Sequence, residues 1–462
     1  MEADESRIAH RRATTAAMSE IAIHHRPAEL LQRLIRFDTS NPPGGERACI
    51  EWAQQLLEAG GCIVQIVARD PERPNLIARL RGEGRAPGLL MQGHVDVVPA
   101  EGSWSRPPFG GEVAEGYVWG RGALDMKGGV AMMLAAFLQA AEADARPPGD
   151  VVLCLLSDEE AGGDYGARFV VENHAELFDG VRYAIGEFGG FTMEIAGRRF
   201  YPMMVAEKQL CSLRATLRGP AGHGSLPVRG GAMGRLGRLL AALDRRRLPV
   251  HVTPTVRSMI EAIAADVPPA TRMPLRALLR PRLTDAVLER LGDRGRLFDA
   301  LLHNTASATV VSGGHAHNVI PGEVSVDLDC RLLPGFGPDD VVEELRTLAR
   351  VDVDFDVVRF DPGPPAPDMT LFDTLAGVLR ALDPAARPVP LLLPGVTDGR
   401  FFARLGIQTY GFLPMQLPEE MRFMELVHAE DERIPVEALE FGTSAIHRLL
   451  ERFGEATATA VD

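Results

Sequence analysis

A histidine and an aspartate directly follow an apolar run in the first half of the chain. His94 and Asp96 stand in the motif GHVDVVP, after the run 89–93. In extended backbone, residues two apart share a face, so the two side chains should project together. A carboxylate beside an imidazole fixes its tautomer, as it does behind metal-bound histidines. The motif therefore indicates a metal site, with a satisfied polar pair at a strand end as the alternative.

Two further motifs place carboxylates in segments next to an apolar run or a helix. Asp125 lies in the glycine-rich loop GRGALDMKGG, which leads into a helix. It could cap that helix, or it could present its two oxygens to two metal ions. The triplet Asp158, Glu159 and Glu160 follows the apolar run VVLCLL. Three adjacent acids at the exit of a buried strand repel one another unless cations neutralise them, although a surface acidic turn would show the same pattern.

The remaining candidates are one more acid and one late histidine. Glu187 ends an apolar segment and precedes FGG, and His428 stands in LVHAE. A lone histidine there would usually be structural. Two histidines and three carboxylates at strand ends, however, supply the ligands of a zinc pair about 3.5–4 Å apart, with a bridging hydroxide as nucleophile. The chain contains neither G-x-S-x-G nor H-E-x-x-H, which disfavours a serine hydrolase and a thermolysin-like zinc site.

The elements that must position these residues follow from the apolar pattern. Short apolar runs alternate with amphipathic helices from about residue 30, which predicts an α/β sheet covered on both faces. Strands are expected at 75–80, 89–93, 151–156 and 182–185, and helices at 47–59 and 128–142. The second helix is apolar around most of its surface, so it should be buried. Ligands bind at the carboxyl ends of the strands in such sheets, where the candidate residues lie.

The pattern changes at residue 207. Strands at 209–217, 308–311, 323–331 and 353–359, with helices at 231–243 and 339–349, give the order β-α-β-β-α-β. This ferredoxin-like unit folds as a small domain by itself. We therefore predict a chain of successive parts: an N-terminal extension (1–26), the first part of an α/β catalytic domain (27–206), an inserted α+β domain (207–360) with an extra helical stretch (246–304), the second part of the catalytic domain (361–453), and a disordered tail (454–462).

Charge and cysteine content disfavour several classes of protein. The formal net charge is -14 at pH 7, which argues against nucleic-acid and anionic-membrane partners, because both need a basic face. No segment approaches the length of an apolar membrane span. The five cysteines are an odd number, widely spaced and without a C-x-x-C pair. A disulfide framework is therefore disfavoured, and a reducing cytoplasm is expected.

Eight motifs run in an order that strongly resembles the M20 metallopeptidase family. Over roughly residues 30–452 they are GHVDVVP, GRGALDMKGG, SDEE, GEFGG, GHGS, HNVIP, GVTDGR and the late His428. The family includes aminoacylases, acetylornithine deacetylases, succinyl-diaminopimelate desuccinylases and glutamate carboxypeptidases. The resemblance implies a zinc-peptidase-like catalytic domain, and it implies that the inserted unit is a lid and dimerisation domain.

The resemblance also implies roles for the candidate residues. Two divalent ions would be bound, Zn²⁺ by preference, with Co²⁺ or Mn²⁺ as substitutes. The ligands would be Asp125 as the bridge, His94 and Glu187 at one ion, and Glu160 and His428 at the other. Glu159 would be the general base, which takes the proton of the bridging water and hands it to the leaving amine. Asp96 would orient the first histidine.

Further residues would contact the substrate. His223 in GHGS resembles the histidine that reaches into the partner subunit's site and stabilises the developing oxyanion, which implies a homodimer. Asn318 and Arg331 match positions that contact a small-molecule substrate, and the fork of Arg331 suits a free carboxylate. Thr397 and Asp398 would line the same pocket. Arg331 could instead be a structural ion-pair partner, and the Thr397-Asp398 pair a simple turn.

The position of Glu187 bears on the substrate. Family deacylases tend to carry Glu there and family peptidases Asp, which favours hydrolysis of N-acyl amino acids over a metallo-dipeptidase or carboxypeptidase. A binding protein that keeps the fold without catalysis is disfavoured. Such a protein would have no use for Glu159, whose implied role is proton transfer alone, yet this residue is present together with all five ligands.

Overall fold

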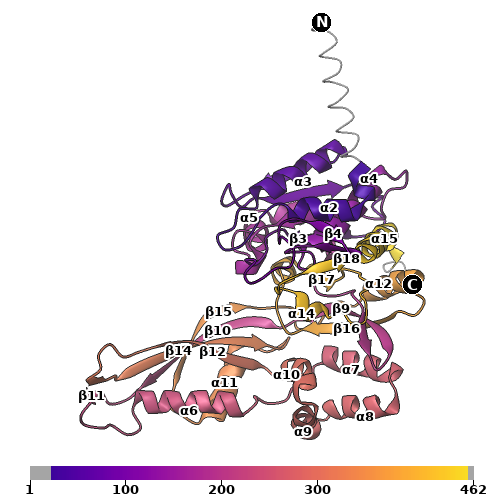
Figure 1. The fold of residues 1–462 in the computed structure, drawn as a ribbon. Helices are drawn as coiled ribbons and strands as arrows, with labels where there is room; N and C mark the ends of the chain where they lie inside the picture. The colour runs from indigo at the N-terminus through magenta and orange to yellow at the C-terminus, as the bar shows by residue number, and fades with distance from the viewer. Residues whose placement is uncertain (1–21, 456–462) are drawn as a thin grey trace. The chain divides into compact units, whose positions relative to one another are not determined.

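The computed structural model describes residues 22–455, which divide into two compact units (Figure 1). The first unit contains residues 22–205, 368–389 and 397–455. The second contains residues 206–367 and 390–396. The predicted N-terminal extension up to residue 21 and the predicted tail from residue 456 lie outside the described residues.

The larger sheet is mixed, and apart from the ends of β9 and β16 its strands belong to the first unit. Its order is β1-β2-β6-β3-β7-β17-β9-β16, and β8 pairs with β9. The strands are β1 (Val64–Val67), β2 (Asn75–Leu80), β3 (Gly88–His94), β6 (Val151–Leu156), β7 (Val181–Gly186), β8 (Met193–Ile195), β9 (Arg198–Glu207), β16 (Arg387–Leu393) and β17 (Gln408–Gly411). Neighbours among β6, β3, β7 and β17 run parallel. Helices flank this sheet, which confirms the predicted α/β class.

Helices pack on both faces of the sheet. A large apolar core joins one face to α2 (Pro27–Ile35), α3 (Arg47–Ala59), α4 (Lys127–Glu142), α12 (Phe372–Leu382) and α15 (Val436–Arg452). A smaller core joins the other face to α5 (Ala167–Asn173) and α13 (Gly399–Phe402). As the sequence predicts, α4 is buried on every side from its first residue to Leu138, because apolar side chains surround it.

The three central parallel strands end at one edge of the sheet. β3 lies between β6 and β7. The register pairs His94, the last residue of β3, with Leu156, the last residue of β6. It also pairs Met91 with Ile185 near the end of β7. Side chains that directly follow these strands are therefore brought together by backbone pairing alone.

The second unit is an antiparallel sheet with helices. Its strand order is β12-β14-β10-β15, and α6 and α11 share an apolar core with it. The elements are β10 (Gln209–Arg218), α6 (Ala232–Arg245), β12 (Thr305–Ser312), β14 (Glu323–Leu332), α11 (Pro338–Ala349) and β15 (Asp354–Asp361). This confirms the inserted β-α-β-β-α-β unit. The stretch 246–304 forms α7 (Pro254–Asp266), α8 (Pro269–Leu278), α9 (Pro281–Leu291) and α10 (Arg296–Leu302).

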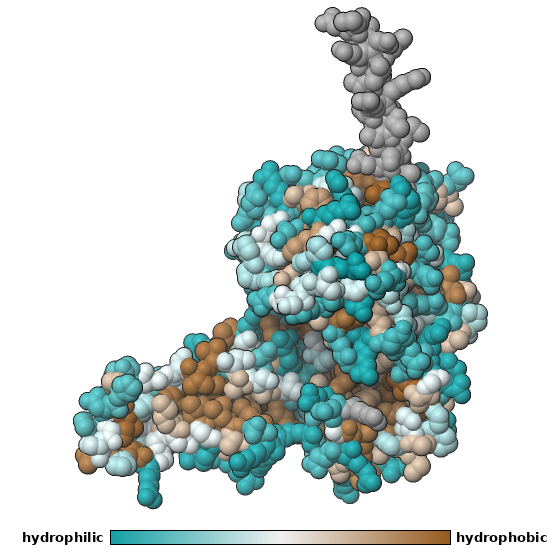
Figure 2. Space-filling model, in the orientation of Figure 1, coloured by the Kyte–Doolittle hydropathy of each residue, from teal (hydrophilic) through white to brown (hydrophobic). Residues whose placement is uncertain are grey.

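Hydrophobic side chains gather on the exposed surface of this second sheet. Val310 and Val311 on the edge strand β12 are 53% and 57% exposed, and Val357 and Val358 on the other edge strand, β15, are 50% and 60% exposed. Figure 2 shows hydrophobic residues clustered over these strands. Exposed apolar clusters on sheet edges are typical of surfaces that bind another chain.

Some local structure differs from the sequence expectation. Strand β9 was not expected, because Pro202 interrupts its apolar pattern and proline usually argues against a central strand. The last residues of the predicted N-terminal extension form a short 3-10 helix, η1 (Ala22–His25), which buries His24. All five cysteines are buried free thiols. Among the described residues, no helix combines the length and the apolar character needed to cross a bilayer.

Candidate active site

His94 ends β3 with both ring nitrogens in contact with polar atoms. Its Nδ1 lies 3.0 Å from the backbone carbonyl oxygen of Asp96 and 3.5 Å from the Asp96 carboxylate. Donation to the carbonyl places the ring hydrogen on Nδ1 and leaves Nε2 with the lone pair that a metal ion requires. Nε2 lies 3.3 Å from Asp125 Oδ1 and 3.4 Å from Glu187 Oε2. The closer contact that orients this ring is thus with the main chain of Asp96.

His428 meets the same aspartate from a distant part of the chain. Its Nε2 lies 3.1 Å from Asp125 Oδ2 and 3.2 Å from Glu160 Oε1. Asp125 therefore turns one carboxylate oxygen to each histidine. The backbone of His428 has a φ of 63°, a left-handed conformation that non-glycine residues seldom adopt. Such strain is common at functional sites, where surrounding contacts hold it in place.

The spacing of these atoms fits a pair of four-coordinate metal ions. With metal–ligand bonds of about 2.0–2.1 Å, ligand atoms around a tetrahedral Zn²⁺ lie about 3.3 Å apart. The four contacts between histidine nitrogens and carboxylate oxygens measure 3.1–3.4 Å. Glu160 Oε1 is buried without a hydrogen-bond partner, which is unusual unless an ion or a water completes the contact. The donor set and its spacing therefore suit two divalent cations.

Negative charge accumulates around the two histidines. Burial, followed by the charge of Glu187, raises the pKa of Glu159 well above its ordinary value. Burial also raises the pKa of Glu187 to about 8 and that of Asp398 to about 7. The protein groups alone therefore do not balance these carboxylates at neutral pH. Divalent cations would supply the missing positive charge and keep the acids ionised.

The carboxylate of Asp96 positions the acids that follow β6. It accepts hydrogen bonds from the backbone N–H groups of Glu159 and Glu160, each at 3.1 Å. It also accepts one from Asn41 Nδ2 at 2.8 Å. Asp96 thus couples the first histidine, through its main chain, to the two glutamates, through its side chain. The sequence predicted only the coupling to the histidine.

Asp158 is the structural member of the acid triplet. Its φ of 72° lies in the left-handed region, which aspartate tolerates better than most residues. Its carboxylate lies 2.9 Å from Arg73 Nη1 and accepts hydrogen bonds from Asn41 Nδ2 at 3.1 Å and Tyr165 N at 3.0 Å. Sequence reasoning missed Asn41 and Arg73, since no local pattern connects them to the triplet.

Glu432 holds the loop that carries Asp125. This buried carboxylate accepts hydrogen bonds from three backbone N–H groups of the loop 122–125, at 2.7–3.1 Å. Arg121 Nη1 donates to it at 2.8 Å, and Arg121 Nη2 donates to the carbonyl oxygen of His428 at 3.2 Å. One acid–arginine pair therefore fixes the loop of Asp125 and the backbone of His428 together. In the sequence, Glu432 is marked only by its position four residues after His428.

Thr397 and Asp398 are buried beside the site. Thr397 Oγ1 accepts a hydrogen bond from Gly399 N at 3.0 Å, at the start of α13. Both carboxylate oxygens of Asp398 are buried without a hydrogen-bond partner, and its charge contributes to the raised pKa of Glu159. Arg400 Nη1 lies 3.9 Å from Glu159 Oε1. The charges of this loop therefore act on Glu159.

His223 and Asn318 lie close together in the second unit. His223 forms the two-residue strand β11 (Gly222–His223) and is exposed. Its Nδ1 lies 2.7 Å from Ser225 Oγ and accepts a hydrogen bond from Ser225 N at 3.3 Å. The neutral ring then carries its hydrogen on Nε2, which makes Nε2 a donor. Gly224 N donates to the carbonyl oxygen of Asn318 at 2.7 Å, so both predicted residues belong to one local structure.

Arg331 lies on β14 and already has an acidic partner. Its Nε lies 2.8 Å from Asp329 Oδ1 and its Nη2 lies 3.1 Å from Asp329 Oδ2. The two residues are two apart on one strand and so share a face. This is the ion pair that the sequence left open as an alternative, and a substrate carboxylate would have to share the guanidinium with Asp329.

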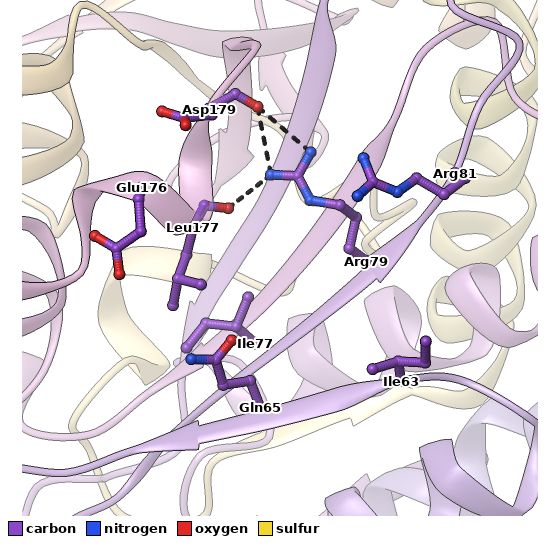
Figure 3. Close-up of a pocket in the computed structure, with 8 residues that line it drawn as sticks. All are labelled: Ile63, Gln65, Ile77, Arg79, Arg81, Glu176, Leu177 and Asp179. Atoms are coloured by element: carbon purple, nitrogen blue, oxygen red, sulfur yellow. Dashed lines mark hydrogen bonds between the residues drawn. The ribbon is translucent and has the colours of Figure 1, made fainter.

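A separate cavity of about 440 Å³ lies along β1 and β2 (Figure 3). Arg79 lines it, and its guanidinium donates to the backbone carbonyl oxygens of Leu177 and Asp179. Because β2 and β6 are antiparallel, Arg79 lies opposite Val152, near the start of β6. The acid triplet follows the other end of that strand, so this cavity is not part of the candidate site.

Comparison with known proteins gives one consistent result. Residues 90–452 match the family model described as peptidase family M20/M25/M40. The human N-fatty-acyl-amino acid synthase/hydrolase PM20D1 is 28% identical over 387 residues, which cover 80% of this chain and 75% of that protein. The succinyl-diaminopimelate desuccinylase of Paracoccus denitrificans is 28% identical over 448 residues, which cover 92% and 98%.

Solved structures share the fold. The M20 family metallo-carboxypeptidase Sso-CP2 from Sulfolobus solfataricus aligns with a TM-score of 0.65 at 18% identity, over 93% of this chain and 99% of that chain. A dinuclear metal binding peptidase of the M20 family from Bacillus subtilis aligns with a TM-score of 0.60 at 15% identity, over 94% and 99%. At these identities the likeness concerns the fold alone.

Proposed function

The chain belongs to peptidase family M20/M25/M40, and from this premise we propose that it is a di-zinc hydrolase of the amide bond in N-acyl amino acids. Membership makes it an enzyme that hydrolyses amide bonds. The observation that carries the metal centre is the position of Asp125, whose two oxygens lie 3.3 and 3.1 Å from two different histidine nitrogens.

Five side chains would bind the two metal ions. His94 and Glu187 would hold one ion and Glu160 and His428 the other, with Asp125 shared. Two bound ions would acidify a water molecule and polarise the scissile carbonyl. Zn²⁺ suits this mixture of imidazole and carboxylate ligands, and Co²⁺ or Mn²⁺ would be substitutes.

Glu159 is the proposed general base. It would take a proton from the attacking water and pass it to the nitrogen of the leaving amine. Burial and the charges of Glu187 and Asp398 oppose its ionisation and raise its pKa, whereas His94 favours the ionised form. A carboxylate whose pKa is raised is a stronger base than an ordinary glutamate, which suits a group that accepts a proton from water.

Two features support an N-acyl amino acid as the substrate. Glu187 is the residue that deacylases of the family tend to carry. The two relatives described above by sequence are named as a synthase/hydrolase of N-fatty-acyl amino acids and a succinyl-diaminopimelate desuccinylase. A metallo-dipeptidase or carboxypeptidase is the alternative. We further propose that Asn318, Arg331, Thr397 and Asp398 help to hold the substrate and its free carboxylate, and that the buried free thiols reflect a cytoplasmic location.

A substrate panel tests the proposed activity. Chelated enzyme receives Zn²⁺, Co²⁺ or Mn²⁺ and is then assayed with N-acyl amino acids of increasing acyl length and with matched dipeptides. We expect metal-dependent release of the amino acid from the acyl series at a kcat/KM at least tenfold above that for dipeptides. A higher kcat/KM for the dipeptides would establish the peptidase alternative instead.

We also propose that the second unit forms a homodimer and that His223 serves the partner's site. The exposed valines on β12 and β15 support association of the sheet with a second copy. The Nε2 donor of His223 suits a developing oxyanion, a charge that appears only in the transition state. Loss of His223 should therefore depress kcat more than it raises KM.

Subunit mixing tests the proposal for His223. Chains with Glu159→Ala are mixed with chains that carry His223→Ala, under conditions that exchange subunits. Half of the dimers are then mixed, and one site of each mixed dimer joins an intact Glu159 to an intact His223. About a quarter of wild-type activity should return from two inactive parents. No recovery after confirmed exchange would place His223 in its own chain's site or outside catalysis.

A further inference from the structure

A second group of metal-ligating side chains lies at the other end of α4. His24 and His25 belong to η1, and Glu142 is the last residue of α4. Glu142 Oε2 lies 3.0 Å from His24 Nε2 and 3.3 Å from His25 Nε2. All three ligand atoms lie within 4.8 Å of one another. At about 1.5 Å per residue, α4 separates this group from Asp125 by roughly 24 Å.

His24 is an unusual member of this group. Its side chain is only 2% exposed, yet neither ring nitrogen makes a hydrogen bond with a described residue. The nearest charged group is the Glu142 carboxylate, whose Oε2 lies 3.0 Å from His24 Nε2. Buried polar atoms normally have a hydrogen-bond partner. An ion bound to Nε2 and to the carboxylate would give this buried nitrogen a partner.

The distances agree with tetrahedral coordination. Ligand atoms of a tetrahedral Zn²⁺ lie about 3.3 Å apart, and the pairs here measure 3.0 and 3.3 Å. The corresponding pairs in the candidate active site measure 3.1–3.4 Å. The side chains of His25 and Glu142 are 60% and 44% exposed, so water can reach the group and supply a fourth ligand.

We propose that His24, His25 and Glu142 form an additional site for one divalent ion of the Zn²⁺ class, distinct from the metal pair. Two imidazoles and one carboxylate are a ligand set that favours Zn²⁺ over Mg²⁺ or Ca²⁺. Gln139 Nε2 already donates to the carbonyl oxygen of His24 at 2.9 Å. A bound ion adds a cross-link between η1 and α4 and so stabilises the folded N-terminal turn.

The test is a comparison of zinc content. Wild-type enzyme, Glu142→Gln and His25→Asn are stripped with a chelator, reloaded with Zn²⁺, freed of excess metal and analysed for bound zinc. The replaced side chains are half exposed, so the fold should persist. Glu451→Gln is the matched control, because Glu451 also lies in the last turn of a helix, α15, near a histidine, with 3.9 Å between His447 Nδ1 and Glu451 Oε1.

We expect both variants to bind one equivalent less than the wild type, and the control to bind as much as the wild type. The variants should hydrolyse the substrate at the wild-type rate. Zn²⁺ should raise the melting temperature of an Asp125→Ala chain, which lacks the shared ligand, by more than it raises that of the Asp125→Ala/Glu142→Gln chain. Equal zinc content in wild type and Glu142→Gln would overturn the proposal. Because the result is a difference, it does not depend on how many ions the active site binds.

Discussion

Glu159→Gln is expected to lower kcat by about 10²–10⁴-fold, because the amide cannot accept a proton from the attacking water. Both metal ions should remain bound, since the proposed ligands are other residues. The backbone N–H of Glu159, which donates to Asp96 at 3.1 Å, is unchanged by the substitution. Kinetics at saturating substrate combined with metal analysis of the same sample provides the measurement.

Glu160→Gln is the matched control for that prediction. Its Oε1 lies 3.2 Å from His428 Nε2, and its backbone N–H donates to Asp96 as that of Glu159 does. The amide is a weaker metal ligand, so metal affinity should fall and added Zn²⁺ should restore part of the activity. If instead Glu159→Gln lost metal and Glu160→Gln kept it, the base and the ligand would be exchanged.

Removal of the metal ions is expected to abolish activity and to lower the free energy of unfolding. An ion that binds only the folded chain stabilises it by about 2.7 kcal/mol when its concentration is a hundred times Kd. Chelation removes that contribution and leaves Asp125, Glu160 and Glu187 close together. Readdition of Zn²⁺ should restore both properties. Fully active enzyme with no more than one ion per chain would contradict the two-metal mechanism.

The metal-free protein should also show a distinctive pH dependence. Burial raises the pKa of Glu187 from 4.5 to about 8. Between these values the folded chain binds more protons than the unfolded chain, so the free energy of unfolding falls as pH rises. His428, whose pKa is raised to about 10 mainly by hydrogen bonding to Asp125, has the same sign. Denaturant unfolding from pH 5 to 8 should show this fall in chelated protein and a weaker one with Zn²⁺.

The sequence by itself determined which residues meet at the candidate site. His94, the acid triplet and Glu187 each follow an apolar run, and parallel pairing of β6, β3 and β7 places the ends of those runs at one edge. That prediction needs only local periodicity and the rule for parallel sheets. The inserted antiparallel unit was predictable for the same reason, because apolar residues recur at regular intervals along its strands and helices.

Only the tertiary structure decided how those residues are held. Glu432 binds the Asp125 loop across more than 300 residues of sequence, and Asn41 joins Asp96 to Asp158. The burial of Asp398 likewise depends on neighbours that no local pattern identifies. His24 and His25 belong to the predicted N-terminal extension, and they meet Glu142 at the end of α4. Periodicity specifies the face of an element, whereas contacts between distant segments depend on how whole elements pack.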